Sequence, residues 1–264
     1  MNKKIKIIVA AHKKYQMPKD EMYVPVQVGA EGKEKIENYQ QDNAGENISN
    51  KNPYFCELTG LYWAWKNLNS DYIGLVHYRR YFTSKKHLPK AEEEKFKCVL
   101  TNEQANELLE KADIILPKKR NYYIEDLYSH YKHTMYVEPL DETGNIIKEK
   151  YPEYYNEFEK LHKRKSAHMF NMFIMKKDVL NKYCEWLFDI LFELENRMDD
   201  SQYDSFHARF YGRVSELLLD VWINTNQIKY EEAKVMDMQN VNWLKKGSSF
   251  ILAKFTGKKY KKSF

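Results

Sequence analysis

The sequence predicts an α/β fold in which a mostly parallel sheet is flanked by helices. Short apolar runs that are typical of strands alternate along the chain with patterns of helical spacing, and this order favours parallel strands joined by helices. The run at residues 72–76 is nearly continuously apolar, as expected for a strand that is buried on both faces. With 264 residues and 43% hydrophobic content, the chain can build one large domain or a domain with an appendage.

The N-terminal part is predicted to contain two strands, a long polar loop and a helix. The strands are expected at residues 5–11 and 23–28. Residues 30–52 form a polar connection, and loops of this length in compact domains are usually functional or disordered. Asn52 and Pro53 predict the start of a helix, because asparagine is a good N-cap and proline is tolerated in the first turn. The helix is expected to end near residue 67.

Two faces can be distinguished on this helix. Leucine and aromatic side chains at helical spacing predict a core face made of Leu58, Leu61, Tyr62 and Trp65. Trp63 falls on the other side of the helix. It is either packed under the polar loop or exposed in a binding site.

The alternation of strands and helices continues after the strand at residues 72–76. Residues 121–165 are polar, rich in tyrosine and irregular, and carry no repeat. The elements expected in this part of the chain are a helix at 103–111, a strand at 112–117, short helices around 124–133 and 151–162, a strand at 168–175, and helices at 178–197 and 210–224.

Composition and charge restrict the function. The net charge of +5 is modest, so nucleic acid is not an expected partner. Three cysteines without metal or redox spacing favour a reduced, cytoplasmic setting. No signal peptide and no apolar run of about 20 residues is present, which predicts a soluble or peripheral protein. Residues 245–264 carry seven lysines and no acid, and are either a solvated terminus or a tail that rests on an anionic membrane surface.

Several nucleotide and hydrolase motifs are absent from the chain. It has no phosphate-binding P-loop and no Gly-x-Gly-x-x-Gly, which argues against an ATPase, a kinase and a classical dehydrogenase. It also has no Gly-x-Ser-x-Gly, which argues against a serine hydrolase. The pair His130 and His133 is a weak metal signal, because isolated histidine pairs are more often packing or surface features.

Basic residues follow two of the predicted strands directly. The strand at 72–76 ends in His77, Tyr78, Arg79 and Arg80, and the strand at 112–117 is followed by the basic residues 118–120. Ligands of open α/β sheets lie at the carboxyl ends of strands, and the planar fork of arginine suits phosphate oxygens. The sequence therefore predicts a ligand that bears phosphate at this edge of the sheet.

The polar loop and three acids supply further candidates. Asp42, Asn43 and Asn47 either read a ribose or a base edge, or form a chain of Asx-turns that caps the following helix. The carboxylates singled out by position are Glu57 in the first turns of a helix, Asp113 at the start of a strand, and Glu216. Glu216 follows Arg213 by three residues, so an ordinary ion pair on one helix face is its simplest interpretation.

These segments, taken together and in order, resemble those of a known family. The matching stretches are Asp42-Asn-x-Gly-x-Asn-Ile-Ser49, Asn52-Pro-x-x-Cys-Glu-Leu-Thr-x-Leu-Tyr-Trp-Ala-Trp-Lys-Asn67, Tyr72-Ile-Gly-Leu-x-His-Tyr-Arg-Arg-Tyr-Phe82 and Phe170-Asn-Met-Phe-Ile-Met175. They are similar to a group of small bacterial glycosyltransferases of capsular polysaccharide, exopolysaccharide and O-antigen synthesis, whose shared domain was long regarded as one of unknown function. The resemblance covers residues 5 to about 228.

The resemblance implies a fold and a reaction. It implies a GT-A-like, Rossmann-related domain over residues 1–228, followed by a C-terminal extension over residues 229–264. It also implies transfer of a sugar with inversion from a UDP-sugar, with UDP-galactofuranose as the expected donor, to a glycan or lipid-linked glycan. The alternative is a non-catalytic glycan-binding or scaffold component of a polysaccharide assembly complex.

The resemblance further implies roles for individual residues. Donor binding is expected at Ala10, Ala11, His12, Asp42, Asn43, Asn47, His77, Arg79, Arg80, Lys118 and Arg120. Acceptor binding is expected at Trp63, His168 and Asn171, and the candidates for the catalytic base are Glu216, Asp113 and Glu57. Many nucleotide-sugar enzymes hold a divalent ion with Asp-x-Asp after this strand, whereas this chain has His77 to Arg80 there, so we expect a metal-independent enzyme without a cofactor. The expected location is the cytoplasm, with peripheral contact to the inner face of the plasma membrane.

Overall fold

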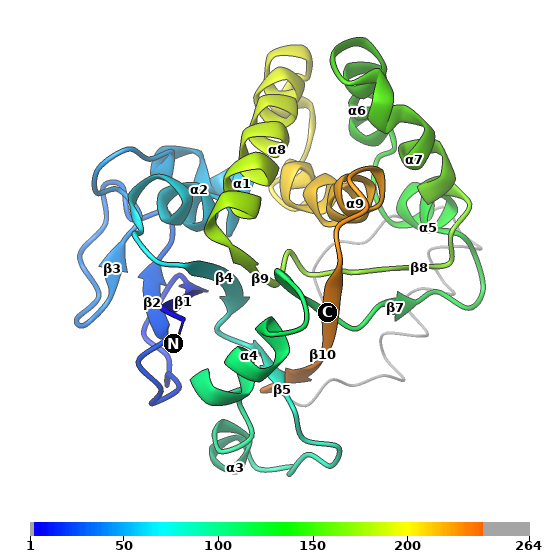
Figure 1. The fold of residues 1–264 in the computed structure, drawn as a ribbon. Helices are drawn as coiled ribbons and strands as arrows, with labels where there is room; N and C mark the ends of the chain where they lie inside the picture. Colours follow the sequence, from blue (N-terminus) through cyan, green and yellow to red (C-terminus); the bar gives the residue numbers. More distant parts are fainter. Residues whose placement is uncertain (1–2, 240–264) are drawn as a thin grey trace. The chain divides into compact units, whose positions relative to one another are not determined.

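The structure is a computed structural model that describes residues 3–239. Tertiary contacts divide the chain into two compact units, each built from segments that are distant in the sequence (Figure 1). The described part of the first unit comprises residues 3–118, 170–185 and 229–239. The described part of the second unit comprises residues 119–169 and 186–228.

The first unit contains the central sheet of eight strands. The strands are β1 (Ile5–Ala11), β2 (Tyr23–Gln27), β3 (Gln40–Gln41), β4 (Tyr72–His77), β5 (Arg80–Thr83), β6 (Ile114–Pro117), β9 (Phe173–Lys176) and β10 (Tyr230–Asp237). β1 lies between β2 and β4 and is parallel to both. The predicted strands at 5–11, 23–28, 72–76 and 112–117 are therefore confirmed within a residue or two.

The prediction of a mostly parallel sheet is wrong, because the sheet is mixed. β5 is antiparallel to both β4 and β10, and β9 is antiparallel to both β4 and β6. The tight turn after β4 reverses the chain at once, so the next strand has to run the other way. A buried apolar run indicates a strand but carries no information on its direction, which is why the sequence did not reveal this.

Gly74 explains how β9 approaches the middle of β4. The two strands are paired from Tyr72 to Leu75, with Gly74 opposite Ile174. A Cβ atom at position 74 would lie 2.8 Å from the backbone oxygen of Phe173, which is closer than side-chain carbons normally come. Glycine is therefore required at this position for the close approach of the backbones.

The C-terminal boundary of the sheet differs from the boundary expected at residue 228. Residues 230–237 form β10, which pairs with both β5 and β6. The segment is Tyr-Glu-Glu-Ala-Lys-Val-Met-Asp, and its few apolar residues do not form the continuous run by which buried strands are recognised. The predicted tail at residues 245–264 lies outside the described residues.

The helix predicted at residues 52–67 is interrupted. The chain forms a short 3₁₀ turn (Ser49–Lys51), then α1 (Asn52–Phe55) and α2 (Leu58–Asn67), with Cys56 between the two helices at φ +53°. The face of α2 that meets the core also differs from the predicted face. Leu58 and Leu61 are buried as predicted, but Tyr62 and Trp65 are only half-buried, and Trp63 is 5% exposed. The prediction that Trp63 contacts an acceptor is therefore wrong, because this side chain belongs to the core.

The first unit has two more short helices. They are α3 (Glu92–Phe96) and α4 (Asn102–Leu109), and α4 begins with a capping box between Thr101 and Gln104. The long helix α8 (Lys177–Arg197) begins in this unit, as the Asp178 signal predicted. Within residues 3–239, no helix is long and apolar enough to cross a bilayer.

The second unit is mainly helical. Its elements are α5 (Leu127–Thr134), α6 (Glu138–Lys150), α7 (Pro152–His162), α8 from residue 186 onward, α9 (Phe210–Thr225), a 3₁₀ turn (Asp200–Gln202), and the two-stranded sheet of β7 (Arg120–Asn121) and β8 (Ser166–Ala167). α7 packs against α6 and α9. α6 was not predicted, because its Thr143-Gly144-Asn145 stretch is poor in helix formers.

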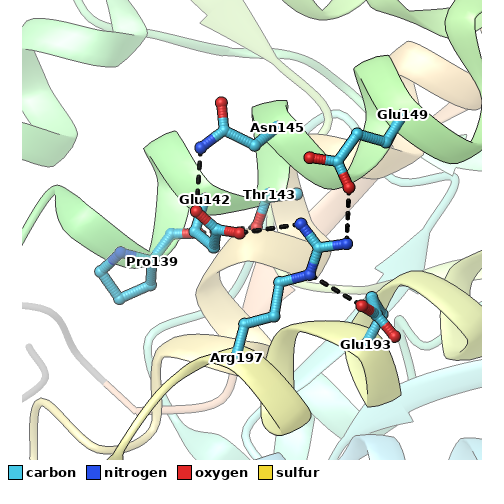
Figure 2. A network of polar contacts seen from close by, with 7 residues as sticks. All are labelled: Pro139, Glu142, Thr143, Asn145, Glu149, Glu193 and Arg197. Atoms are coloured by element: carbon cyan, nitrogen blue, oxygen red, sulfur yellow. Dashed lines mark hydrogen bonds and ion pairs between the residues drawn. The ribbon is translucent and has the colours of Figure 1, made fainter.

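Arg197 connects the last turn of α8 to α6 (Figure 2). Its guanidinium group contacts Glu142 at 3.1 Å and Glu149 at 2.7 Å on α6, and Glu193 at 2.7 Å one turn earlier on α8. Asn145 donates a hydrogen bond to the other oxygen of Glu142, which holds that carboxylate in place. The planar fork of arginine allows one side chain to orient two helices in this way.

A histidine of α5 that lies beside a buried carboxylate makes the stability of the protein depend on pH. Glu125 is 8% exposed, and its two oxygens accept hydrogen bonds from Nδ1 of His130 at 3.1 Å and Nδ1 of His133 at 2.8 Å. Burial lowers the pKa of His130 to about 4, although the nearby Glu125 raises it. His130 is therefore neutral in the folded protein at neutral pH.

We expect the replacement of His130 with glutamine to flatten this pH dependence. Because the pKa of His130 is about 6.5 in the unfolded chain and about 4 in the folded protein, protonation favours unfolding. The contribution is present above about pH 6.5 and is lost as the pH falls towards about 4, by roughly 2–3 kcal/mol. Urea unfolding across this range measures it. His87→Gln, at an exposed position, should keep the wild-type slope, and an unchanged slope in His130→Gln would contradict the assignment.

Candidate active site

The basic end of β4 lies beside the carboxyl end of β1. His77 pairs with Ala10 of β1 and with Arg80 of β5, and the backbone N–H of Tyr78 donates to the carbonyl of Ala10 at 3.2 Å. The carbonyl of Arg79 accepts a hydrogen bond from Met238, just after β10, at 2.9 Å. The turn that presents these basic side chains is thus fixed on two sides by main-chain hydrogen bonds.

The two adjacent arginines are in different environments. Arg80 is 9% exposed, its Nε donates to Asp237 at 3.0 Å, and its guanidinium carbon lies 4.3 Å from the centre of the Phe170 ring. Arg79 is half-buried, and its side chain makes no hydrogen bond or ion pair with any of residues 3–239. Arg80 therefore holds the site together, whereas the charge of Arg79 is not neutralised by the described part of the chain.

Glu57, His77 and Asn171 form a polar group next to this turn. Nδ2 of Asn171 donates to Oε1 of Glu57 at 2.8 Å, although the two residues are 114 positions apart. Nε2 of His77 donates to the carbonyl of Phe170 at 2.6 Å. Burial lowers the pKa of His77, Glu57 raises it, and Arg80 and Arg79 lower it. His77 is therefore neutral at neutral pH, with its proton on Nε2.

The backbone is strained where this polar group is assembled. Among the described residues, five that are not glycine have positive φ, and three of them lie here: Cys56 at +53°, Phe170 at +82° and Asn171 at +50°. Cys56 immediately precedes Glu57. Such conformations cost about 1–3 kcal/mol each and cluster at functional sites. The strained backbone positions are therefore at, or next to, the residues whose side chains meet, Glu57 and Asn171.

An aromatic cluster lies beside the turn. Tyr78 stacks on Tyr15 with ring centres 3.9 Å apart, and His12 meets the edges of both rings. The hydroxyl of Tyr39 accepts from the backbone N–H of Tyr15 at 2.9 Å. Burial raises the pKa of Tyr15, so its hydroxyl stays protonated. The cluster places flat rings next to Arg79, where the heterocycle of a nucleotide can contact them.

The polar loop is held by Asp42, which is completely buried. One carboxylate oxygen accepts from the N–H of Ala30 and the hydroxyl of Ser49, and the other accepts from the N–H of Gly29 and the hydroxyl of Thr59. These four hydrogen bonds use the acceptor capacity of the group. Asp42 is therefore a structural residue of the loop, which corrects its prediction as a donor ligand.

The Asn47 side chain is engaged within the same loop. Its Nδ2 donates to the carbonyls of Asn43 and Gly45, and its Oδ1 accepts from the N–H of Ser49 at 3.1 Å. This is the chain of local turns that was the alternative interpretation of the loop. Asn43 is half-buried, and its proposed donor contact stays a prediction.

We expect Asp42→Asn to lower the free energy of unfolding by about 2–4 kcal/mol. Each carboxylate oxygen faces a backbone N–H, so an amide NH₂ in either place would oppose a donor and leave buried groups without partners. Denaturation in urea measures the loss. Asn43→Ala is the matched control and should change stability by less than about 0.5 kcal/mol; equal stability of both variants would show that Asp42 does not hold the loop.

Asp113 and Lys118 lie at opposite ends of β6. Asp113 precedes this strand, which is parallel to β4 because β9 is antiparallel to both. Its exposed carboxylate therefore lies at the end of the sheet away from His77, with a distant contact of 3.9 Å to Lys176, and the prediction of Asp113 as a base is wrong. Lys118 is exposed at the carboxyl end of β6, where its N–H bonds to Ala233.

Three predicted residues belong to the second unit. His168 is fully buried, and its Nδ1 and backbone N–H both bond to the carboxylate of Asp220. The prediction that His168 contacts an acceptor is wrong, because its partner 52 residues later holds it inside the unit. Arg120 packs its guanidinium 5.0 Å from the Tyr122 ring, and Glu216 is half-buried on α9. The predicted roles of Arg120 in donor binding and of Glu216 as a base stay predictions.

Reasoning from the sequence missed several residues of the site. Tyr15, Tyr78, Asp237 and the strained Cys56 and Phe170 were not singled out for a role. Only Tyr78 carried a signal, since it lies within the basic segment. Within residues 3–239, no group of three or more histidine, cysteine, aspartate or glutamate side chains is arranged to hold a metal ion.

The fold and the site define an α/β protein with a cationic, strained carboxyl edge of its sheet, and comparison with known proteins gives its family. The chain belongs to the family described as domain of unknown function DUF4422, whose model matches residues 6–227. Among solved structures, it is similar to the WbbM bifunctional glycosyltransferase in its apo form, with a TM-score of 0.82 and 29% identity. The match covers 90% of this chain and 46% of that chain, so this chain spans slightly less than half of it. No curated protein matches.

Proposed function

We propose that this protein is a glycosyltransferase of cell-surface polysaccharide synthesis that uses a UDP-sugar. The observation that carries the proposal is Arg79, an arginine at the carboxyl end of a central strand whose charge has no partner within residues 3–239. A diphosphate is the ligand that such a group fits best. The similarity to WbbM, which is described as a bifunctional glycosyltransferase, supports the same class of reaction.

The roles that we propose in the reaction belong to side chains of the first unit. Glu57 is the base that we propose: its carboxylate takes the proton of the acceptor hydroxyl, and the acceptor oxygen forms a bond to the anomeric carbon. The bond from that carbon to the phosphate oxygen breaks at the same time, and UDP leaves with its negative charge opposite Arg79. A single displacement of this kind inverts the anomeric configuration.

Asn171 and His77 position these groups. Asn171 donates to one oxygen of Glu57 and so orients the carboxylate. His77, neutral and bonded to the Phe170 carbonyl, fixes the strained turn from which Asn171 projects. Ala10, Ala11 and His12 at the end of β1, with the rings of Tyr15 and Tyr78, offer a place for the uridine.

The donor, the metal requirement and the location are parts of the same proposal. UDP-galactofuranose is the first donor to test, with a glycan or lipid-linked glycan as acceptor. The segment 77–80 contains no acid, so the charge of Arg79 takes the place of a divalent ion in this proposal. The proposed place of action is the cytoplasmic side of the membrane, where a nucleotide-sugar and a lipid-linked acceptor meet.

Ligand-dependent unfolding and donor hydrolysis test the proposal together. UDP should raise the unfolding temperature progressively with concentration, by the equivalent of about 2.7 kcal/mol at 100 times Kd. A panel of UDP-sugars, with manganese or with EDTA, should show hydrolysis or transfer of one sugar in both buffers. No stabilisation by UDP would contradict the proposal. Stabilisation by a glycan without any turnover would instead favour a non-catalytic component of an assembly complex.

A further inference from the structure

The loop between β7 and α5 carries two unusually exposed hydrophobic side chains. Tyr123 is 85% exposed and Ile124 is 62% exposed, whereas the next large hydrophobic residues in the described part of the chain, Tyr136 and Tyr54, are 39% and 38% exposed. Two adjacent side chains of this size, both turned to solvent, are not explained by the packing of the second unit. Clustered exposed apolar residues mark interaction sites.

The loop is firmly anchored at its base. The N–H of Tyr122 donates to the carbonyl of Lys165 at 2.7 Å, and the N–H of Leu127 donates to the carbonyl of Arg164 at 2.8 Å. Because these two carbonyls belong to consecutive residues, the four residues between Tyr122 and Leu127 must project as a short loop. The loop is beside the strand pair β7 and β8 (Figure 1).

The other two residues of the loop hold it from within. Glu125 turns inward to His130 and His133, and Asp126 caps α5 by accepting from the N–H of Ser129 at 2.7 Å. Both acids are therefore used by the protein itself. The exposed part of the loop consists of Tyr123 and Ile124, which are presented on an ordered base rather than by a loose segment.

The surroundings of the loop are basic. Lys163 and Lys165 are exposed and make no side-chain hydrogen bond or ion pair with residues 3–239, while Arg164 between them is neutralised by Glu157 at 2.7 Å. On the other strand, Lys119 and Arg120 precede the loop, and no acid occurs between residues 118 and 124. The apolar side chains at the tip suit an apolar layer, and the lysines at its base suit anionic groups that cover such a layer.

We propose that Tyr123 and Ile124 form a membrane-docking tip that enters the headgroup region of an anionic bilayer. The isoleucine buries its side chain at the boundary of the acyl chains, and the tyrosine suits the interface because it is apolar with a polar end. Lys163 and Lys165 meet the lipid phosphates. The inference does not depend on the glycosyltransferase proposal, and it concerns a different segment from the C-terminal lysines.

Co-sedimentation of the full-length protein with vesicles tests the tip. Vesicles of phosphatidylcholine alone and vesicles that also contain phosphatidylglycerol are compared, with the C-terminal lysines present in every variant. Tyr123→Ser with Ile124→Ser should weaken binding to the anionic vesicles by at least about tenfold. Lys163→Gln with Lys165→Gln should weaken it about fivefold per lysine and remove most of the preference for phosphatidylglycerol.

A matched control uses a tyrosine of ordinary exposure. Tyr54→Ser changes a side chain that is 38% exposed in the first unit and should bind vesicles like the wild type. All variants should unfold at the wild-type temperature, since the replaced side chains are exposed. If the Tyr123 and Ile124 variant bound anionic vesicles as strongly as the wild type, the proposal would be overturned, because other residues would then be responsible for membrane binding. The proposal would also be overturned if the wild-type protein bound neither kind of vesicle. A third contrary result would be a variant that still binds vesicles but no longer binds a soluble glycan or protein.

Discussion

Replacing Arg79 with alanine should remove most of the affinity for UDP while leaving the protein folded. A charge-assisted contact from arginine to phosphate is worth about 1.5–3 kcal/mol, which corresponds to a Kd about 10- to 100-fold higher. Because the departing diphosphate gains charge in the transition state, kcat/KM should fall further, by about 100- to 1,000-fold. The measurements are UDP titration by calorimetry and initial rates of sugar transfer.

Two other basic residues control for the loss of charge. Lys111→Ala removes an exposed charge before β6, at the end of the sheet away from Arg79, and should change UDP affinity by less than about threefold. Arg80→Ala should act differently, since it leaves Asp237 without its partner and uncovers Phe170, so the free energy of unfolding should fall. Wild-type UDP affinity in Arg79→Ala would exclude this residue from the donor site.

Replacing Glu57 with glutamine should abolish transfer without abolishing donor binding. The amide has nearly the same shape but does not take up a proton, and the loss of a general base lowers the rate by about 100- to 10,000-fold. UDP should still raise the unfolding temperature as in the wild type. Comparing the transfer rate with the stabilisation by UDP separates this variant from Arg79→Ala, in which both should be lost.

The alternative carboxylates serve as comparison. Asp113 lies at the opposite end of the sheet, so Asp113→Asn should transfer sugar at the wild-type rate. Glu216→Gln tests the other candidate, which belongs to the second unit. If Glu216→Gln lost the activity while Glu57→Gln kept it, the base would be Glu216, and the Glu57–Asn171 contact would be structural.

Some features of the fold were readable from local sequence alone. The strands β1 and β4 were recognised because a buried strand is marked by an apolar run, and the start of α8 was recognised from Asp178. The sequence did not predict the direction of β9, nor that β10 belongs to the central sheet. Pairing with β4, β5 and β6 decides both, and those partners are far away in the chain.

The same distinction applies to the candidate site. The sequence by itself determined that a histidine and two arginines follow a buried strand, since composition and order are local. Only the tertiary structure decided that Asp237 neutralises Arg80 and leaves Arg79 without a partner among the described residues. It also decided that Glu57 meets Asn171, that Asp42 is buried, and that Trp63 lies in the core. The physical reason is that burial and hydrogen bonding depend on neighbours in space, and here those neighbours are up to 157 positions apart along the chain.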